Sequence, residues 1–351
     1  MPLTHAGWSA LAVLLSAAVV SQEPRGRTES RADHPPRKVI VATAIFGPYG
    51  KYPGLPARLE QLGSIVDDMA AQAKTKYSGR GLDLAILPEW AVTSTAGSIE
   101  ERAIPLDGPA QTALSALARK HRTYILAGLD MVETGTSGKK FANAAVLFDR
   151  GGKVAGIYRK MHPVALVGKD DLEGGVTPGG ATPVFACDFG KLGVQICWDI
   201  QFDDGWQALA NAGAEIVAWP SASPAKALPA ARAGLHRYFI VSSTWRDNAT
   251  VFEPTGLVAA QVRGPDRILV HELDLSFAIL GWSSGLREGE ALREKYGSRV
   301  GFHYEGSEDM GLFWSNDRAT PVGAMVRSIG GEELDAQLAR NRRLQNAARQ
   351  K

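Results

Sequence analysis

The sequence predicts a layered α/β protein built on a mixed sheet. Short, wholly apolar runs typical of buried strands alternate with segments whose apolar residues recur at helical spacing. Glycine-containing turns join some strand-like runs directly, which indicates antiparallel hairpins among strands that are otherwise linked by helices. With 351 residues, 45% of them hydrophobic and 22% charged, the chain can bury a sizeable core in one large domain or two ordinary ones.

The first half of the chain contains two strand–helix units, a third strand and a hairpin. Residues 39–45 are apolar throughout, as in a buried strand, whereas Leu55, Leu59 and Leu62 begin a helical repeat. The expected elements are a strand over 39–45, a helix over about 55–75, a strand over 82–87, a helix opening at 107–109, a strand over 124–129, and hairpin strands over 144–148 and 154–158.

The second half continues this alternation and then changes in composition. The expected elements are a strand ending at Cys197, a helix over 206–212, a strand over 215–219, a helix over 225–236, a strand over 238–244, and strand-like runs near 249–253, 257–262 and 267–273. From about residue 284 the chain is more charged and richer in glycine. We expect a main domain over 39–285 and a C-terminal extension over 286–351 that ends in a charged, surface-packed helix.

The N-terminus has the pattern of an export signal. Residues 8–20 are apolar but too few to span a bilayer, and Val19 and Ser21 suit the −3 and −1 positions of a cleavage site. We therefore expect a signal peptide over 1–21, a disordered polar leader over 22–38, and an exported protein, periplasmic or extracellular. The alternative is an N-terminal helix that anchors or docks, in which case the protein is cytoplasmic.

The charge distribution argues against a nucleic-acid partner. Residues 1–38 hold five basic and three acidic residues, so of the 39 basic and 37 acidic residues in the chain the remainder holds 34 of each. A balanced body without a basic stripe does not fit phosphate-backbone binding. The sequence also has no HExxH, CxxC or glycine-rich phosphate loop, and no run long enough to cross a membrane. We expect no cofactor, no metal and no membrane span.

The chain has two cysteines, Cys187 and Cys197. The residues between them include a turn at 188–191, and Cys197 lies much further from that turn than Cys187 does. Antiparallel pairing around the turn would keep the two sulfur atoms beyond disulfide reach. We therefore expect two free thiols.

Cys197 ends an apolar run, and a thiol at a strand end is held rigidly where loops can bind a substrate. A buried cysteine more often behaves as a small hydrophobic residue, so other residues must decide between that interpretation and a nucleophile. Glu89 follows an apolar strand and a proline, and Lys160 follows the hairpin. Amide cleavage by a thiol requires a base, a stabiliser of the oxyanion and a proton for the leaving amine. Glu89 and Lys160 could supply these if the strand ends converge.

Each of these residues also has a simpler interpretation. Glu89 could cap a helix, and Lys160 could be a solvated charge at a hairpin. His162 could form a pair with Cys197, as in a papain-like thiol peptidase. Trp90, Trp198 and Phe202 could line a pocket or simply fill the core. Asp199 is expected to make a structural hydrogen bond beside the nucleophile.

Together the three stretches resemble the signature set of the nitrilase superfamily, the carbon–nitrogen hydrolases, in order and spacing. The resemblance covers about residues 39–283. The motifs that carry it are Ile86-Leu87-Pro88-Glu89, Tyr158-Arg159-Lys160-Met161-His162 and Gly193-Val194-Gln195-Ile196-Cys197-Trp198-Asp199, with support from Thr177-Pro178-Gly179, Ala210-Asn211-Ala212-Gly213-Ala214-Glu215-Ile216 and Glu253-Pro254-Thr255-Gly256.

This resemblance implies a four-layer αββα sandwich with mixed sheets, usually assembled as a homodimer or larger homo-oligomer. It implies that Glu89 is the general base, that Cys197 is the nucleophile, and that Lys160 and the backbone N–H of Trp198 stabilise the oxyanion. A second glutamate often lies between the lysine and the cysteine in this family. Glu173 is the best match, and Asp170 and Asp171 are its competitors. The resemblance also implies that His162 supports the lysine loop or the pocket wall.

The implied activity is hydrolysis of a non-peptide amide of a small molecule through a cysteine thioester. Nitriles and N-carbamoyl compounds are alternative substrates for the same triad, and a non-catalytic binding or assembly protein is the alternative of another class. The chain departs from the family in having Gln201 where many relatives have an arginine, and in its export signal and long C-terminal extension. These departures leave the substrate open.

Overall fold

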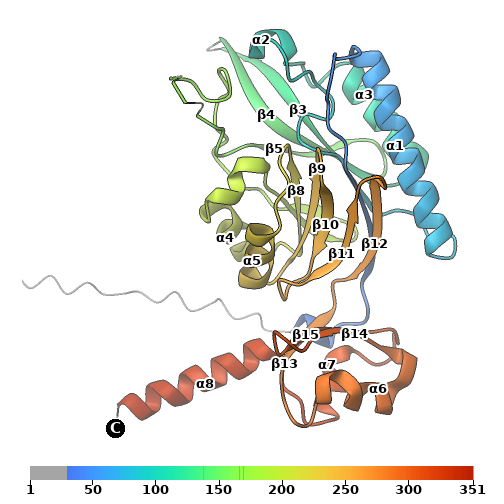
Figure 1. Cartoon of the computed structure of the whole chain (residues 1–351), viewed down its shortest axis with the longest axis vertical. Coiled ribbons are helices and arrows are strands. Elements are labelled where there is room, and N and C mark those ends of the chain that lie inside the picture. The colour runs from blue at the N-terminus through green and yellow to red at the C-terminus, as the bar shows by residue number, and fades with distance from the viewer. Residues whose placement is uncertain (1–29, 137, 166, 169, 351) are drawn as a thin grey trace, which may run out of the picture.

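The computed structural model describes residues 30–350 except 137, 166 and 169. The signal peptide expected over 1–21 and residues 22–29 of the leader therefore lie outside the described residues. Two six-stranded sheets form the body, and a smaller three-stranded sheet lies beyond one end of it (Figure 1). Among the described residues, no helix is long and apolar enough to cross a membrane.

The first sheet has the strand order β12-β1-β2-β3-β4-β5. Its strands β1, β2 and β3 run parallel, and the other neighbouring pairs are antiparallel. The strands β3 and β4 are longer than the sequence predicted, because their polar ends also pair with each other as an exposed ribbon. The strands are β1 (Lys38–Ala44), β2 (Leu84–Ile86), β3 (Tyr124–Gly135), β4 (Gly138–Phe148), β5 (Val154–Arg159) and β12 (Ile268–Asp274).

The second sheet has the order β11-β10-β9-β8-β7-β6, with β7, β8 and β9 parallel. The hairpin of β6 and β7 pairs Cys187 with Gly190, and both Cys187 and Cys197 are free thiols, as the turn between them predicted. The strands are β6 (Phe185–Cys187), β7 (Gly190–Val194), β8 (Ile216–Ser221), β9 (Phe239–Thr244), β10 (Asn248–Phe252) and β11 (Val258–Arg263).

Each large sheet packs helices on one face and the other sheet on its second face. Because successive side chains of a strand point to opposite faces, Ile40 and Ala42 of β1 face the helices while Val39 and Val41 face the other sheet. The long helix α1 (Leu55–Lys76) and α3 (Pro109–His121) cover the first sheet (Figure 1). The helices α4 (Asp204–Asn211) and α5 (Ala227–His236) cover the second. The predicted αββα sandwich is thereby confirmed.

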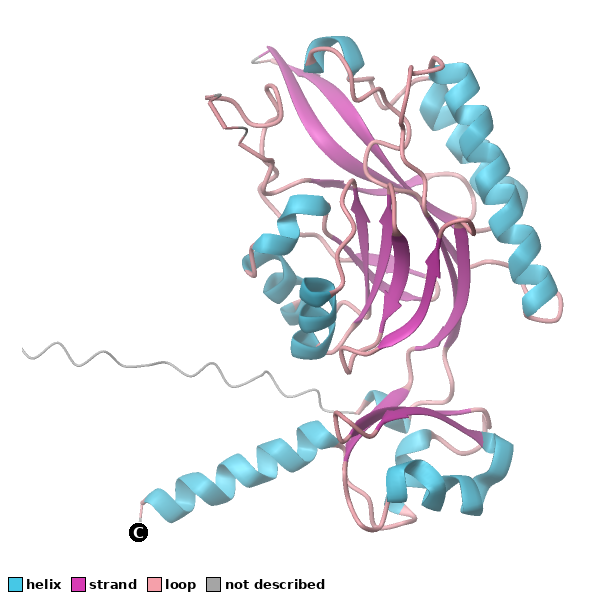
Figure 2. Cartoon of the chain, viewed as in Figure 1, coloured by secondary structure: helices cyan, strands magenta, loops and turns pink. Residues whose placement is uncertain are grey.

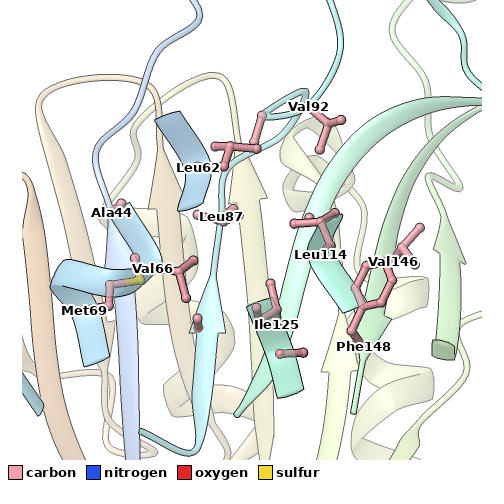
Figure 3. Packing of buried hydrophobic residues seen from close by; sticks show 14 of the residues in the cluster. Ala44, Leu62, Val66, Met69, Leu87, Val92, Leu114, Ile125, Val146 and Phe148 are labelled. Atoms are coloured by element: carbon pink, nitrogen blue, oxygen red, sulfur yellow. The ribbon is translucent and has the colours of Figure 1, made fainter. Parts of the chain in front are cut away.

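The core between the first sheet and its helices shows why the helical spacing of apolar residues predicted α1. The apolar residues of α1 recur every three or four positions, so they form one stripe that packs against the sheet. Figure 3 shows this stripe within the cluster of buried residues to which it belongs: Leu62, Val66 and Met69 of α1, Leu114 of α3, and Ile125, Val146 and Phe148 of the strands.

The C-terminal region contains more strand than its composition indicated. The strands β13 (Phe277–Gly281), β14 (Val300–Glu305) and β15 (Met310–Ser315) form the third sheet, in which β15 is central. The strand β13 begins before residue 286, so the structural boundary lies earlier in the chain than the sequence suggested. Two short helices, α6 (Glu290–Tyr296) and α7 (Val322–Arg327), pack on one face of this sheet. β14 was missed because most of its residues are only half-buried.

The other face of the third sheet extends the core between the two large sheets. Phe277, Ile279 and Leu312 join the cluster that contains Val39 and Leu273. Because it shares this core, the C-terminal region is an appendage of the sandwich. Figure 2 places it at the end of the sandwich opposite the loop that carries α2 (Ile99–Arg102).

The expected disordered leader is wrong for residues 30–38. Residues 31–33 form a short 3-10 helix, and Ala32 is fully buried against the C-terminal region. The polar residues that suggested disorder instead bind residues near the other end of the chain. Ser30 donates to Glu333, and Arg327 pairs with Asp33. Arg37 pairs with Glu215 at 2.7 Å. We call residues 30–37 the N-terminal strap.

The last helix, α8 (Leu334–Arg349), was predicted, but not its packing. Leu334 contacts the core at the first turn, and across the rest of its described length α8 has no buried residue and extends away from the body (Figure 2). Leu338 and Leu344 are 52% and 60% exposed. The helix is therefore packed only at its start.

Replacing Ala32 by Glu should weaken the protein, because the new carboxylate would be buried in the apolar cluster under α7 without a partner. We expect the free energy of unfolding to fall by about 2 kcal/mol or more. Urea denaturation measures the change, and Ala347→Glu on the exposed face of α8 is the matched control. Equal stability of the two variants would mean that the strap does not pack as described.

Candidate active site

The loops after β2, β5, β7 and β8 enclose a cavity of about 300 Å³. Glu89 and Lys160 come from the first sheet and Cys197 from the second, so the site exists only where the two sheets face each other. Strand ends at one edge of a layered sheet are a common place for a ligand site. The cavity is lined by Glu89, Trp90, Thr95, Arg102, Lys160, Val164, Glu173, Cys197 and Ala222.

Cys197 lies in a sharp turn three residues past the end of β7. Its φ of 44° is in the left-handed region, which residues other than glycine seldom adopt, and it opens a 3-10 helix over Cys197–Gln201. The Asp199 carboxylate holds this turn by accepting bonds from the Ile196 N–H and the Tyr158 hydroxyl, each at 2.8 Å. Trp219 donates its indole N–H to the Cys197 carbonyl at 3.1 Å. Asp199 thus has the structural role that the sequence suggested.

The Cys197 side chain is held as a neutral thiol. Burial raises its pKa to about 12, and the Glu89 carboxylate adds to this effect while Lys160 opposes it. The Ser221 side chain acts with Lys160 to lower this pKa. A thiol with such a pKa is protonated at neutral pH, so it needs a base within reach to become a nucleophile. Glu89 is in that position.

Glu89 is fully buried and is surrounded by hydrogen-bond donors. Its Oε1 accepts from Lys160 Nζ at 2.9 Å and from Asn143 Nδ2 at 2.8 Å. Its Oε2 accepts from the Ala222 N–H at 2.8 Å. The Trp245 indole donates to the Glu89 backbone carbonyl at 2.7 Å, which holds the backbone of Glu89 in place. The simpler interpretation of Glu89 as a helix cap is not what the structure shows.

Lys160 is 1% exposed and lies between two carboxylates. Its Nζ is 2.9 Å from Glu89 Oε1 and 2.5 Å from Glu173 Oε1. Burial works against its charged form, but the two carboxylates outweigh burial, and together with Cys197 they raise the pKa of Lys160 above its ordinary value. Lys160 is therefore a permanent cation beside the thiol and not a solvated hairpin charge.

The structure selects Glu173 over the two aspartates that compete with it in the sequence. Glu173 is buried, binds Lys160, and accepts from the Val164 N–H at 3.0 Å. Asp170 and Asp171 are exposed, and Asp171 accepts from the Gly174 N–H of its own loop. The carboxylate that reaches the lysine is the one that faces inward from the loop.

Trp90 forms one wall of the cavity, and an ion pair behind it sets its orientation. Its indole N–H donates to Asp130 Oδ1 at 2.9 Å, and Arg102 Nε donates to Asp130 Oδ2 at 2.6 Å. Burial raises the pKa of Asp130 to about 6, although Arg102 and Trp90 act in the opposite direction. Arg102 also donates to the Glu173 carbonyl at 3.1 Å, so it ties the wall to the loop that carries Glu173.

The structure corrects the expectation that His162 and Phe202 line the pocket. The two rings stack on each other at 4.0 Å, and neither is among the residues that line the cavity. The His162 backbone N–H and Nδ1 lie 2.8 and 3.0 Å from Asp199 Oδ1, so His162 supports the turn and does not pair with Cys197. The Trp198 indole is 43% exposed and also lies outside the lining set.

Sequence reasoning missed Asn143, Arg102 and Asp130. A weak signal existed for Asn143, because it is a polar residue in the middle of an apolar strand, and such residues are rarely buried without a partner. Arg102 and Asp130 carry no comparable local signal. Among the described residues no group of three or more His, Cys, Asp or Glu side chains is arranged to hold a metal ion.

Comparisons with known proteins agree with this geometry. A family model described as carbon-nitrogen hydrolase matches residues 48–279. An omega-amidase of Danio rerio is 26% identical over 238 residues, which cover 61% of this chain and 85% of the relative. A hydrolase of Schizosaccharomyces pombe is 29% identical over 153 residues, which cover 40% of this chain and only 45% of the relative.

A solved structure has the same fold. Nit3 of Saccharomyces cerevisiae, a member of branch 10 of the nitrilase superfamily, superposes with a TM-score of 0.57 at 21% identity, covering 74% of this chain and 95% of Nit3. The family model spans most of the chain, and its region contains all the residues that line the cavity. The chain therefore belongs to the carbon–nitrogen hydrolases of the nitrilase superfamily and is an enzyme of that family.

Proposed function

We propose that the protein hydrolyses carboxamides of small molecules through a thioester on Cys197. The observation that carries this proposal is that Cys197, Glu89 and Lys160 line one cavity, in which Lys160 Nζ lies 2.9 Å from Glu89 Oε1. A neutral thiol, a base and a fixed cation around one cavity meet the requirements of acyl transfer. A cavity of about 300 Å³ suits a small substrate.

In the first half-reaction Glu89 takes the thiol proton as Sγ bonds to the carbonyl carbon. The carbonyl oxygen becomes an oxyanion, for which Lys160 and the backbone N–H of Trp198 are the proposed stabilisers. The C–N bond then breaks, and the proton held by Glu89 passes to the leaving nitrogen, which departs as ammonia or an amine. The acyl group remains on Cys197 as a thioester.

In the second half-reaction water replaces the amine. Glu89 takes a proton from the water as its oxygen attacks the thioester carbon, and the same groups stabilise the second oxyanion. The C–S bond breaks, the carboxylic acid leaves, and the thiol recovers a proton from Glu89. Lys160 keeps its charge throughout, which fits a group whose pKa lies above its ordinary value.

The cavity wall also bears on the acyl group. Arg102 has five N–H donors, of which three bind Asp130 and the backbone carbonyls of Gly97 and Glu173. Its other donors favour an acyl group that carries a hydrogen-bond acceptor. The relatives named omega-amidase support an amide substrate, and nitriles and N-carbamoyl compounds are the alternatives for the same triad.

Export and oligomerisation are part of the proposal. The apolar run over 8–20 supports an export signal, which would place the enzyme in the periplasm or outside the cell. The family resemblance supports a homodimer or larger homo-oligomer. N-terminal sequencing of the secreted protein and light scattering of the purified protein test these two points.

Replacing Cys197 by Ala should abolish ammonia release, because no other group can form the acyl intermediate. A panel of simple amides, N-carbamoyl amino acids and nitriles identifies the substrate class, and the fall in kcat should be roughly a thousandfold or more. Cys187→Ala in β6 is the matched control and should keep full activity. Full activity of Cys197→Ala would refute the mechanism. Binding of panel compounds without turnover by the folded wild-type protein would favour the binding protein.

Lys160→Met should be much more damaging than His162→Ala. The first change removes the proposed oxyanion stabiliser, whose loss lowers kcat by roughly a hundredfold to a thousandfold. The His162→Ala change removes only a contact that supports the turn of Cys197, since the His162 ring binds Asp199 and not the thiol. Steady-state kinetics of both variants, with unfolding curves to confirm that each is folded, make the comparison. The opposite order would indicate a cysteine–histidine enzyme.

A further inference from the structure

One side-chain amide joins the two carboxylates of the site. Asn143 lies in β4 and is fully buried. Its Nδ2 donates to Glu89 Oε1 at 2.8 Å and to Glu173 Oε2 at 3.0 Å, which uses both of its hydrogens. Its Oδ1 is buried and has no hydrogen-bond partner among the described residues. The site therefore uses only the donor half of this amide.

A buried acceptor without a hydrogen-bond partner lowers the stability of the folded protein. A leucine of similar shape would avoid that loss and would suit the apolar residues on either side of Asn143 in β4. The amide is therefore better explained by what its Nδ2 does for the carboxylates than by the packing of the strand. Its backbone carbonyl accepts from the Lys160 N–H at 2.9 Å, which holds it beside the lysine.

The charges around Asn143 explain the need for a neutral donor. Two carboxylates share one ammonium, so the buried group of Glu89, Glu173 and Lys160 has a net charge of −1 when all three are ionised. Like charges at close range favour protonation of one carboxylate. A proton on Glu89 would leave the Cys197 thiol without a base. The Asn143 N–H donors stabilise both ionised carboxylates without adding a further positive charge to the group.

The same bonds determine which oxygen receives the thiol proton. Lys160 and Asn143 together occupy both acceptor positions of Glu89 Oε1. The Ala222 N–H occupies only one position of Oε2. The second position of Oε2 is the place left for the proton from Cys197.

We propose that Asn143 is a positioning residue that keeps Glu89 ionised and reserves its Oε2 atom for the proton of Cys197. This inference rests on the proposed role of Glu89 as the base. A purely structural Asn143 would tie β4 to the Glu173 loop without affecting the protonation of Glu89. The two roles predict different pH profiles for the reactivity of Cys197.

The test is the rate at which iodoacetamide alkylates Cys197, followed by intact mass from pH 4 to 9 in a Cys187→Ala background. This rate needs no substrate turnover. With Glu89 as base, the rate should level off above the pH at which Glu89 loses its proton. Asn143→Leu removes both N–H donors, so the carboxylate should lose its proton only at a higher pH. The midpoint of the alkylation-rate profile should therefore move up by about one pH unit or more.

Two further variants keep the test decisive. Asn143→Asp has the same shape, removes the Nδ2 donors and adds a negative charge, so the midpoint should move in the same direction if the leucine variant fails to fold. Thr93→Val is the matched control, because Thr93 accepts a buried hydrogen bond from the Asp130 N–H near the cavity but does not touch either glutamate. Its midpoint should not move.

An unchanged midpoint in folded Asn143 variants, with rates lowered equally at every pH, would overturn the inference. The proposed function has a separate readout, since Cys197-dependent ammonia release would stand whatever the midpoint does. Conversely, a shifted midpoint in a protein that hydrolyses none of the panel compounds would support the role of Asn143 and refute the proposed substrates.

Discussion

The buried ion pair between Lys160 and the two glutamates is the interaction on which the site depends. Removing three charges from water is expensive, and such a group is stable only when every charge has close partners. Lys160 meets Glu89 and Glu173, and backbone and amide N–H groups also donate to both carboxylates. The cluster is therefore a nearly complete network, and Cys197 lies at its edge in the same cavity.

This network can form only when the two large sheets are packed together. Glu89, Asn143 and Lys160 come from the first sheet, whereas Cys197 and the Ala222 N–H follow strands of the second. The apolar residues that the two sheets bury between them thus bring Cys197 and Glu89 into one cavity. The burial that assembles the site also raises the pKa of Cys197, so the same packing makes the base necessary.

The rest of the molecule supports this arrangement from a distance. The Asp130–Arg102 pair orients the Trp90 wall, and the Asp199 carboxylate holds the turn of Cys197. The N-terminal strap and the third sheet close the far end of the sandwich, where Phe277 and Leu312 cover the core. The cavity thus lies at one end of the body, and the appended elements lie at the other.

The sequence by itself determined the alternation of strands and helices, because burial on one or two faces imposes a period that is local and readable. It also placed Glu89, Lys160 and Cys197 after strands, since each follows an apolar run and belongs to a motif of contiguous residues. Only the tertiary structure decided which acidic residue of the 170–173 loop faces the lysine, and that Asn143, Arg102 and Asp130 belong to the site. The strap was hidden because its partners lie far away in the chain, and a contact between distant residues leaves no local period.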